Sequence, residues 1–182
     1  MMKTISNFIF HKLFGWKTIG LCPTDIKKYI IIGAPHTHWQ DFFLGLALKL
    51  TQKVPVNFIA KASLFKPPFG FIFRALGGAP VDRSKSKNLV DAIVAIFNSK
   101  EQFILALSPE GTRKRVDTWK TGFYHIAKGA NVPIVMMAFD FGNKQIKFSE
   151  PYYLTDDKEK DFNFIYDFYR GIKGKIPEDF NL

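Results

Sequence analysis

The segment Lys28–Gly33 contains three consecutive isoleucines and stops abruptly at Gly-Ala-Pro. An apolar run of this length that ends at Gly and Pro is typical of a buried strand followed by a turn. The first polar side chain after the turn is His36. Because open α/β sheets bind ligands at the carboxyl ends of their strands, the pattern predicts that His36 lies at a ligand-binding edge.

A carboxylate, Asp41, follows His36 five residues later. This spacing is one residue too long for neighbours on one helix face, but a turn that leads into a helix can fold Asp41 back onto the imidazole. A carboxylate there fixes the imidazole tautomer and stabilises the imidazolium, which leaves the other ring nitrogen to accept a proton. The spacing leaves open the alternative of a loop histidine and an unrelated aspartate at a helix N-terminus.

Length and charge limit the class of protein. At 182 residues the chain is long enough for one domain with a full core, and its single cysteine, Cys22, excludes an internal disulfide framework. The net charge is +10, and residues 1–140 carry 19 Lys and Arg against 8 Asp and Glu. This excess favours an anionic partner. The candidates are a phosphorylated small molecule, an acidic carrier protein, a nucleic acid and anionic lipid.

Residues 1–20 mix basic residues with apolar residues at near-helical spacing. Polar interruptions are too frequent for a membrane-spanning helix, which needs about 20 mostly apolar residues, and no secretory signal pattern is present. We expect an amphipathic helix over residues 1–20, lying either in a membrane interface or against the domain, and the main domain over residues 21–182.

Alternating strand and helix patterns over the rest of the chain predict a single α/β domain with a mixed, mostly buried sheet flanked by helices. Further strands are expected at Val54–Ala60, Gly78–Val81, Phe103–Leu107 and Val132–Phe139, with an edge strand at Gln145–Phe148. A helix with the composition of a buried one is expected at Phe42–Leu50. Further helices are expected at Asn88–Asn98, Phe123–Lys128 and Lys158–Ile172, and a short broken helix at Leu64–Leu76.

Two further polar clusters follow predicted strands. The first, Gly77–Ser84, combines glycines that let the backbone approach a ligand with Arg83, whose planar guanidinium suits a phosphate. The second, Ser108–Arg113, contains Glu110, which can bind a hydroxyl or hold a cation. Each cluster alone also fits a solvated turn. Three clusters at three strand ends together predict one convergent site.

These clusters form four blocks, which are His36-x4-Asp41, Gly78-x-Pro80-x-Asp82-Arg83, Pro109-Glu110-Gly111-Thr112-Arg113 and Val132-Pro133-Ile134. In this order they resemble the glycerolipid acyltransferases, specifically the lysophosphatidate (1-acylglycerol-3-phosphate) acyltransferases and their short bacterial relatives. Lys61 and Lys120-x-Gly122 also look like connecting pieces of that family.

The resemblance implies a glycerol-3-phosphate-acyltransferase-like fold. It also implies transfer of a fatty acyl chain from acyl-CoA or acyl carrier protein to a hydroxyl of lysophosphatidate or a related lysolipid, in phospholipid biosynthesis. In that reaction His36 is the general base and Asp41 orients it. Arg83 holds the acceptor phosphate, and Glu110 with Gly111 binds the acceptor or positions the site. The other substrate-binding residues that the resemblance implies are Thr112, Arg113, Lys61 and Lys120.

No metal and no cofactor beyond the acyl thioester is expected, and no nucleic-acid partner. We expect the protein in the cytoplasm, peripheral on the cytoplasmic face of the membrane. Backbone N–H groups near Gly33–His36 or Gly111 are candidates for stabilising the oxyanion of the transition state. The segment Phe65–Phe73 is our expectation for the lining of an acyl-chain groove.

Departures from the family pattern keep alternatives open. His38 stands where the family usually has a small polar residue, so a second imidazole competes for the role of base. The acceptor can also be a lyso-aminolipid. Charge and aromatic content alone fit a non-catalytic module that binds membrane or nucleic acid. A serine hydrolase needs a nucleophile, and the sequence contains no G-x-S-x-G elbow.

Overall fold

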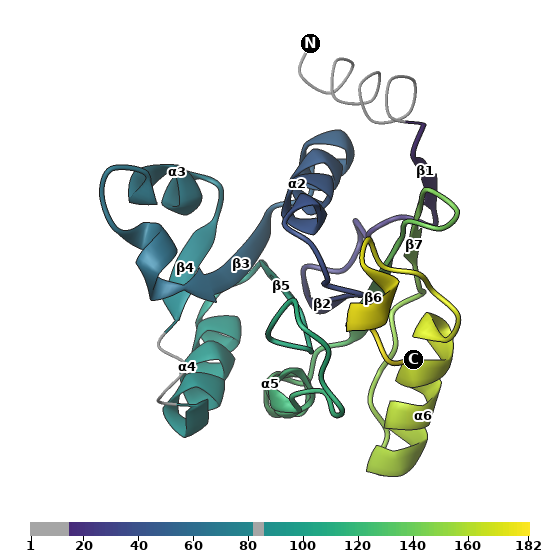
Figure 1. Cartoon of the computed structure of the whole chain (residues 1–182). Helices are drawn as coiled ribbons and strands as arrows, with labels where there is room; N and C mark the ends of the chain where they lie inside the picture. Colours follow the sequence, from purple (N-terminus) through teal and green to yellow (C-terminus); the bar gives the residue numbers. More distant parts are fainter. Residues whose placement is uncertain (1–14, 82–85) are drawn as a thin grey trace.

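The computed structural model describes residues 15–81 and 86–182. Within these residues seven strands form one sheet in the order β1-β7-β6-β2-β5-β3-β4 (Figure 1). Neighbouring strands are parallel except for β6 and β7, which are antiparallel. The predicted mixed sheet is therefore confirmed. The strands are β1 (Lys17–Ile19), β2 (Lys28–Ala34), β3 (Val56–Lys61), β4 (Gly78–Val81), β5 (Phe103–Leu107), β6 (Ile134–Asp140) and β7 (Gln145–Phe148).

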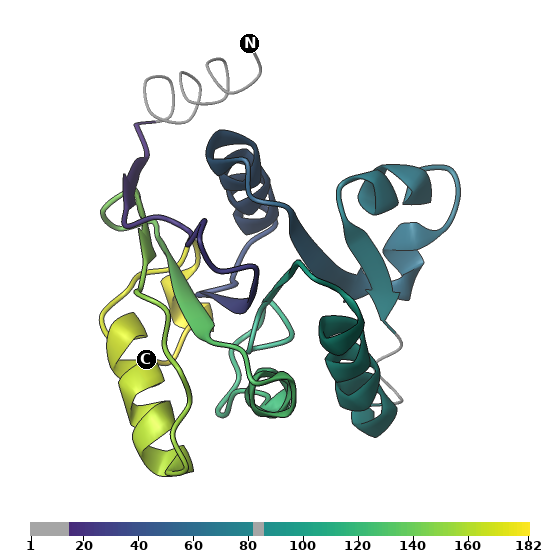
Figure 2. The same cartoon turned by 180° about the vertical axis from the view of Figure 1, so that it is seen from behind.

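Helices cover the two faces of the sheet unequally. Helices α4, α5 and α6 lie on one side, whereas α2 and the short α3 lie on the other (Figures 1 and 2). The α-helices are α2 (Gln40–Gln52), α3 (Gly70–Ala75), α4 (Ser86–Ser99), α5 (Gly122–Ala130) and α6 (Lys158–Tyr169). Two 3₁₀ helices are η2 (Ala62–Phe65) and η3 (Pro177–Asp179). The face under α2 is consequently the more thinly covered one.

Strand β2 is the central strand of the fold. It pairs in parallel with β5 on one side and with β6 on the other. Its side chains alternate between the two cores: Ile30 and Ile32 pack with α4, α5 and α6, while Tyr29 and Ile31 pack on the side of α2. Burial on both faces explains why this strand is a continuous apolar run rather than an alternating one.

Three expectations need correction. Strand β7 is not at the edge, because it pairs with both β6 and β1. The predicted helix over residues 1–20 lies mostly outside the described residues, and Lys17–Ile19 forms β1 because its backbone bonds to β7. Helix α2, expected to be buried, buries few side chains and leaves Phe43 exposed, since it alone covers its part of the sheet.

No helix among residues 15–81 and 86–182 is long and apolar enough to cross a bilayer.

Candidate active site

The carboxyl ends of the parallel strands bring the predicted site residues to one edge of the sheet. Strands β2, β5 and β3 are neighbours in that order. The loop that carries His36 follows β2, the loop Ser108–Arg113 follows β5, and Lys61 is the last residue of β3. The predicted convergence is therefore confirmed for these two loops, and Lys61, which belonged to none of the predicted clusters, ends the strand beside β5. Arg83 lies outside the described residues.

His36 and Asp41 form the central pair of this edge. After β2 the chain turns and enters α2, whose first turn carries Asp41. Imidazole Nδ1 of His36 lies 3.1 Å from Asp41 Oδ2, with Asp41 almost fully buried and the His36 side chain one quarter exposed. The carboxylate therefore orients the ring through Nδ1, and the free ring nitrogen of the pair is Nε2.

His38 is held differently, which separates the two candidate bases. Its backbone N–H donates to Asp41 Oδ2 at 2.9 Å. Its own ring nitrogen Nδ1 accepts a hydrogen bond from the backbone N–H of Gln40 at 3.4 Å. Asp41 thus contacts the imidazole of His36 and only the backbone of His38. The geometry favours His36 as the base.

Glu110 contacts the loop that follows β2 and carries His36. Its carboxylate accepts the backbone N–H of His36 at 2.8 Å and the hydroxyl of Ser108 at 3.0 Å, and its side chain is almost fully buried. Glu110 therefore ties the loop after β5 to the loop after β2. Of the two roles that the sequence suggested for Glu110, this position favours positioning of the site over contact with the acceptor.

Burial also perturbs the titration of Glu110. It raises the pKa of this carboxyl to about 7, against the hydrogen bonds from Ser108 and the His36 N–H, which lower it; the negative charge of Asp41 raises it further. The folded protein therefore binds a proton at Glu110 more tightly than the unfolded chain does.

This difference predicts a pH dependence of stability. Because the folded pKa exceeds the unfolded value of about 4.3, the free energy of unfolding should fall as pH rises from about 4.5 to 7, by about 3 kcal/mol, and level off above that range. Replacement by the uncharged Glu110→Gln should remove this slope. Urea unfolding of both proteins at several pH values measures the difference. Equal slopes for the two proteins would contradict the assignment.

Gly111 and Lys120 close the loop after β5. Gly111 has a φ of +67°, a backbone conformation that residues with a side chain rarely adopt. A Cβ at this position would lie 3.0 Å from the Lys120 side chain. The Gly111 N–H donates to Ser108 O, and the Lys120 N–H donates to Pro109 O. The N–H groups of His36 and Gly111, both candidates for oxyanion stabilisation, thus already have acceptors in this structure.

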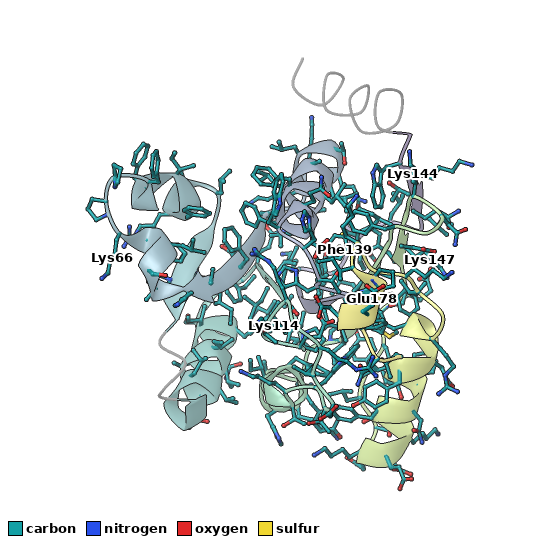
Figure 3. All side chains as sticks on the ribbon, in the orientation of Figure 1. Lys66, Lys114, Phe139, Lys144, Lys147 and Glu178 are labelled. Carbon is teal, nitrogen blue, oxygen red and sulfur yellow. The ribbon has the colours of Figure 1, made fainter. Side chains whose placement is uncertain are left out.

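A groove of about 1870 Å³ opens beside the His36–Asp41 pair. Apolar residues from α2, β2, β3 and β6 line one part of it, and residues from α4, α5 and the loop after β5 line another. The predicted binding residues at its wall are Lys61, Gly111, Thr112, Arg113 and Lys120. Figure 3 labels Lys114, on the loop after β5, and Phe139, on β6, both of which also line the groove. Of the segment Phe65–Phe73, expected to line an acyl groove, only Phe73 does so.

The chain after α6 packs against the loop that follows β2, a contact that no local sequence pattern indicates. The backbone N–H of Ile176 donates to the buried Thr37 hydroxyl at 3.2 Å. Gly174 is so close that a Cβ there would lie 2.7 Å from Thr37 Oγ1. Farther along, Asp179 accepts the backbone N–H of Arg115. This segment therefore contacts both loops of the site.

No group of three or more His, Cys, Asp or Glu side chains comes together as a candidate metal site in the part of the chain that the structure describes.

The blocks of this site match a known family. The family model described as Acyltransferase matches residues 22–140, well over half of the chain. The chain belongs to this Acyltransferase family. The match contains both loops that meet at the His36–Asp41 pair, so the candidate site lies wholly within the acyltransferase region.

Three curated relatives of this chain share the name 1-acyl-sn-glycerol-3-phosphate acyltransferase. The 1-acyl-sn-glycerol-3-phosphate acyltransferases of Salmonella typhimurium and Escherichia coli K12 are each 30% identical over 128 residues, which cover 68% of this chain and 52% of theirs. The enzyme of the same name from Cocos nucifera is 31% identical over 107 residues, 56% of this chain and 34% of its own. The chain spans about half the length of the bacterial relatives.

A solved structure has the same fold. The 1-acyl-sn-glycerophosphate (LPA) acyltransferase PlsC from Thermotoga maritima matches 94% of this chain and 76% of its own with a TM-score of 0.64 and 22% identity. The expected acyltransferase-like α/β architecture is therefore confirmed.

Proposed function

We propose that this protein transfers a fatty acyl chain from a thioester to a hydroxyl of lysophosphatidate or a closely related glycerol-phosphate lysolipid, in phospholipid biosynthesis. The observation that carries the proposal is the His36–Asp41 pair at the wall of a large, mainly apolar groove. Family membership and the names of the relatives support the same reaction.

The proposed chemistry uses His36 as the general base. Nε2 of His36 removes the proton of the acceptor hydroxyl while its oxygen attacks the thioester carbonyl. The C–O bond forms, the C–S bond breaks, and the thiolate leaves and takes up a proton. Asp41 stabilises the imidazolium that forms during attack, since its buried carboxylate faces Nδ1. The route needs no covalent enzyme intermediate, metal or further cofactor.

Cationic side chains around the groove form the proposed binding site for the anionic groups of the substrates. Lys61, Arg113 and Lys120 line it close to the loops of the site. Guanidinium and ammonium groups at such a wall attract the phosphate of the acceptor and the anionic parts of acyl-CoA or acyl carrier protein. Arg83 remains a proposed phosphate ligand on the basis of its motif.

The apolar part of the groove is the proposed site of the acyl chain. Gly33 of β2 and Met137 and Phe139 of β6 form one wall, and Leu48 of α2 lies across from the sheet. Burial of an acyl chain releases about 0.8 kcal/mol per methylene group, so such a lining favours a long-chain thioester.

We further propose that the protein acts in the cytoplasm at the cytoplasmic face of the membrane, where lysolipid acceptors reside. A lyso-aminolipid is the alternative acceptor, and a basic non-catalytic binding module is the alternative of another class. The basic excess of residues 1–140 supports either anionic acceptors or anionic surfaces.

The deciding experiment incubates the purified protein with a long-chain acyl thioester and separate acceptors: glycerol phosphate, lysophosphatidate, a neutral lysolipid and a lyso-aminolipid. Thiol release and lipid product are both followed. We expect product and thiol release to depend on the acceptor and to be greatest with lysophosphatidate. Equal thiol release without acceptor would identify a thioesterase. A folded protein that binds anionic vesicles but releases no thiol would identify a binding module.

A further inference from the structure

Large apolar side chains are exposed around the opening of the groove. They come from the start of α2, from η2 and from α3, and two of them, Phe69 and Phe71, are 64% and 69% exposed. We call this set the apolar rim, and its members are Trp39, Phe43, Leu64, Phe69, Phe71 and Ile72. Exposed apolar groups gathered in one region mark interaction surfaces, whereas scattered ones do not.

Aromatic contacts connect the two ends of this region. Centroid distances along the series are 5.5 Å for Trp39–Phe43, 5.6 Å for Phe43–Phe42, 5.9 Å for Phe42–Phe73 and 6.0 Å for Phe73–Phe65. The start of α2 is thus joined to the η2–α3 segment by touching rings. Both helices stand on the same side of the sheet (Figures 1 and 2). The two parts of the apolar rim, on α2 and on η2–α3, are therefore linked by the half-buried rings of Phe42 and Phe73 and the buried ring of Phe65.

The charge of this segment identifies its partner. Residues 42–81 contain five Lys and Arg and no Asp or Glu. Lys53, Lys61 and Lys66 are exposed, and Figure 3 shows Lys66 at the end of η2, on the outer side of the segment. Arg74 lies 5.5 Å from the centre of the Phe65 ring. Aromatic residues interleaved with cations and free of acidic residues fit the interface of an anionic bilayer.

We propose that the apolar rim inserts into the interfacial region of an anionic membrane, with the neighbouring cations on the lipid phosphates. A second copy of the chain is disfavoured as the partner, because it presents the same excess of positive charge to this surface. Phe and Trp side chains supply the buried apolar area, and the cations add electrostatic attraction to the anionic surface.

Docking in this orientation also brings the groove next to the bilayer. Trp39, Phe43 and Leu64 of the rim line the groove as well as being exposed. If the proposed acyl transfer is correct, an acyl chain passes between bilayer and groove along apolar side chains without crossing water. Phe69 and Phe71 do not line the groove, so they are suited to test docking separately from chemistry.

The test compares the full chain with a Phe69→Ser, Phe71→Ser double variant in vesicle cosedimentation. Vesicles contain phosphatidylcholine with or without phosphatidylglycerol. We expect the wild type to require phosphatidylglycerol and the double variant to bind about tenfold more weakly or worse, since two exposed rings lose their lipid contacts. Tyr153→Ser removes an aromatic residue of similar exposure that follows β7, and should bind as the wild type does.

Tryptophan fluorescence gives an independent readout. Trp16 and Trp119 are buried, so Trp39 is the exposed member of the three tryptophans of the chain. Vesicles with phosphatidylglycerol should shift the emission to the blue, and brominated lipid should quench it. Both effects should disappear in Trp39→Phe.

Four results would overturn the proposal: no binding by the folded wild type, equal binding to both vesicle types, undiminished binding by the double variant, or concentration-dependent self-association that the double variant abolishes. Activity on a short-chain thioester and a water-soluble acceptor separates the two proposals. The double variant should keep that activity while losing vesicle binding. If acyl transfer is absent in all proteins, the binding comparison still decides the docking surface.

Discussion

His36→Ala should lower the turnover number by about 10²–10⁴-fold or more while the protein remains folded. The acceptor hydroxyl has a pKa far above neutral pH, so attack on the thioester needs a base at the moment of bond formation. The His36 ring is oriented for this by the buried carboxylate of Asp41 and is itself one quarter exposed toward the site. Steady-state kinetics with saturating thioester, together with thermal unfolding, measure the effect.

His38→Ala is the matched control, because it removes the neighbouring imidazole. Asp41 accepts from the backbone N–H of His38, which this substitution keeps. We therefore expect activity within a few-fold of the wild type. An active His36→Ala protein combined with an inactive His38→Ala protein would transfer the role of base to His38.

Asp41→Asn should have an effect of similar size. Asp41 Oδ2 faces both His36 Nδ1 and the His38 N–H, so both neighbours require an acceptor there. An amide oxygen can take the place of Oδ2 but carries no negative charge, so it does not stabilise the imidazolium that forms during attack. We expect a loss of about 10²–10⁴-fold in turnover with a small change in the Michaelis constant.

Asp161→Asn is the control for burial of a carboxylate. Asp161 is also fully buried and accepts hydrogen bonds from Tyr124, Tyr152 and Thr155, but none of these four residues lines the groove. Its replacement should lower thermal stability and keep the turnover number of the folded fraction. If Asp41→Asn behaves in the same way, the role of Asp41 is structural.

The sequence predicts those parts of the fold that depend on local pattern. The run in β2 indicates a strand buried on both faces, and the structure places it at the centre of the sheet. The pairing of His36 with Asp41 follows from a turn that leads into a helix, which the spacing allows. Clusters at successive strand ends meet because parallel strands share one carboxyl edge.

Contacts between distant segments could not be predicted in this way. Nothing in the local sequence of Glu110 indicates that its carboxylate faces the backbone of His36, since that depends on β5 lying beside β2. The contact of Ile176 with Thr37 depends in the same way on where the chain runs after α6. The sequence predicts β7 as an edge strand, because β1 is only three residues long and its pattern does not indicate that it pairs with β7.

The position of β2 in the sheet also sets the order in which the protein can assemble during synthesis. Its partners β5 and β6 begin at Phe103 and Ile134, so a ribosome makes most of the domain before β2 is paired on both sides. Until then a strongly apolar segment lacks its neighbours, and pairing of distant parallel strands is slow. Nascent chains that end before Asp140 should therefore depend on chaperones, and the contact of Ile176 with Thr37 in the loop of His36 forms later still.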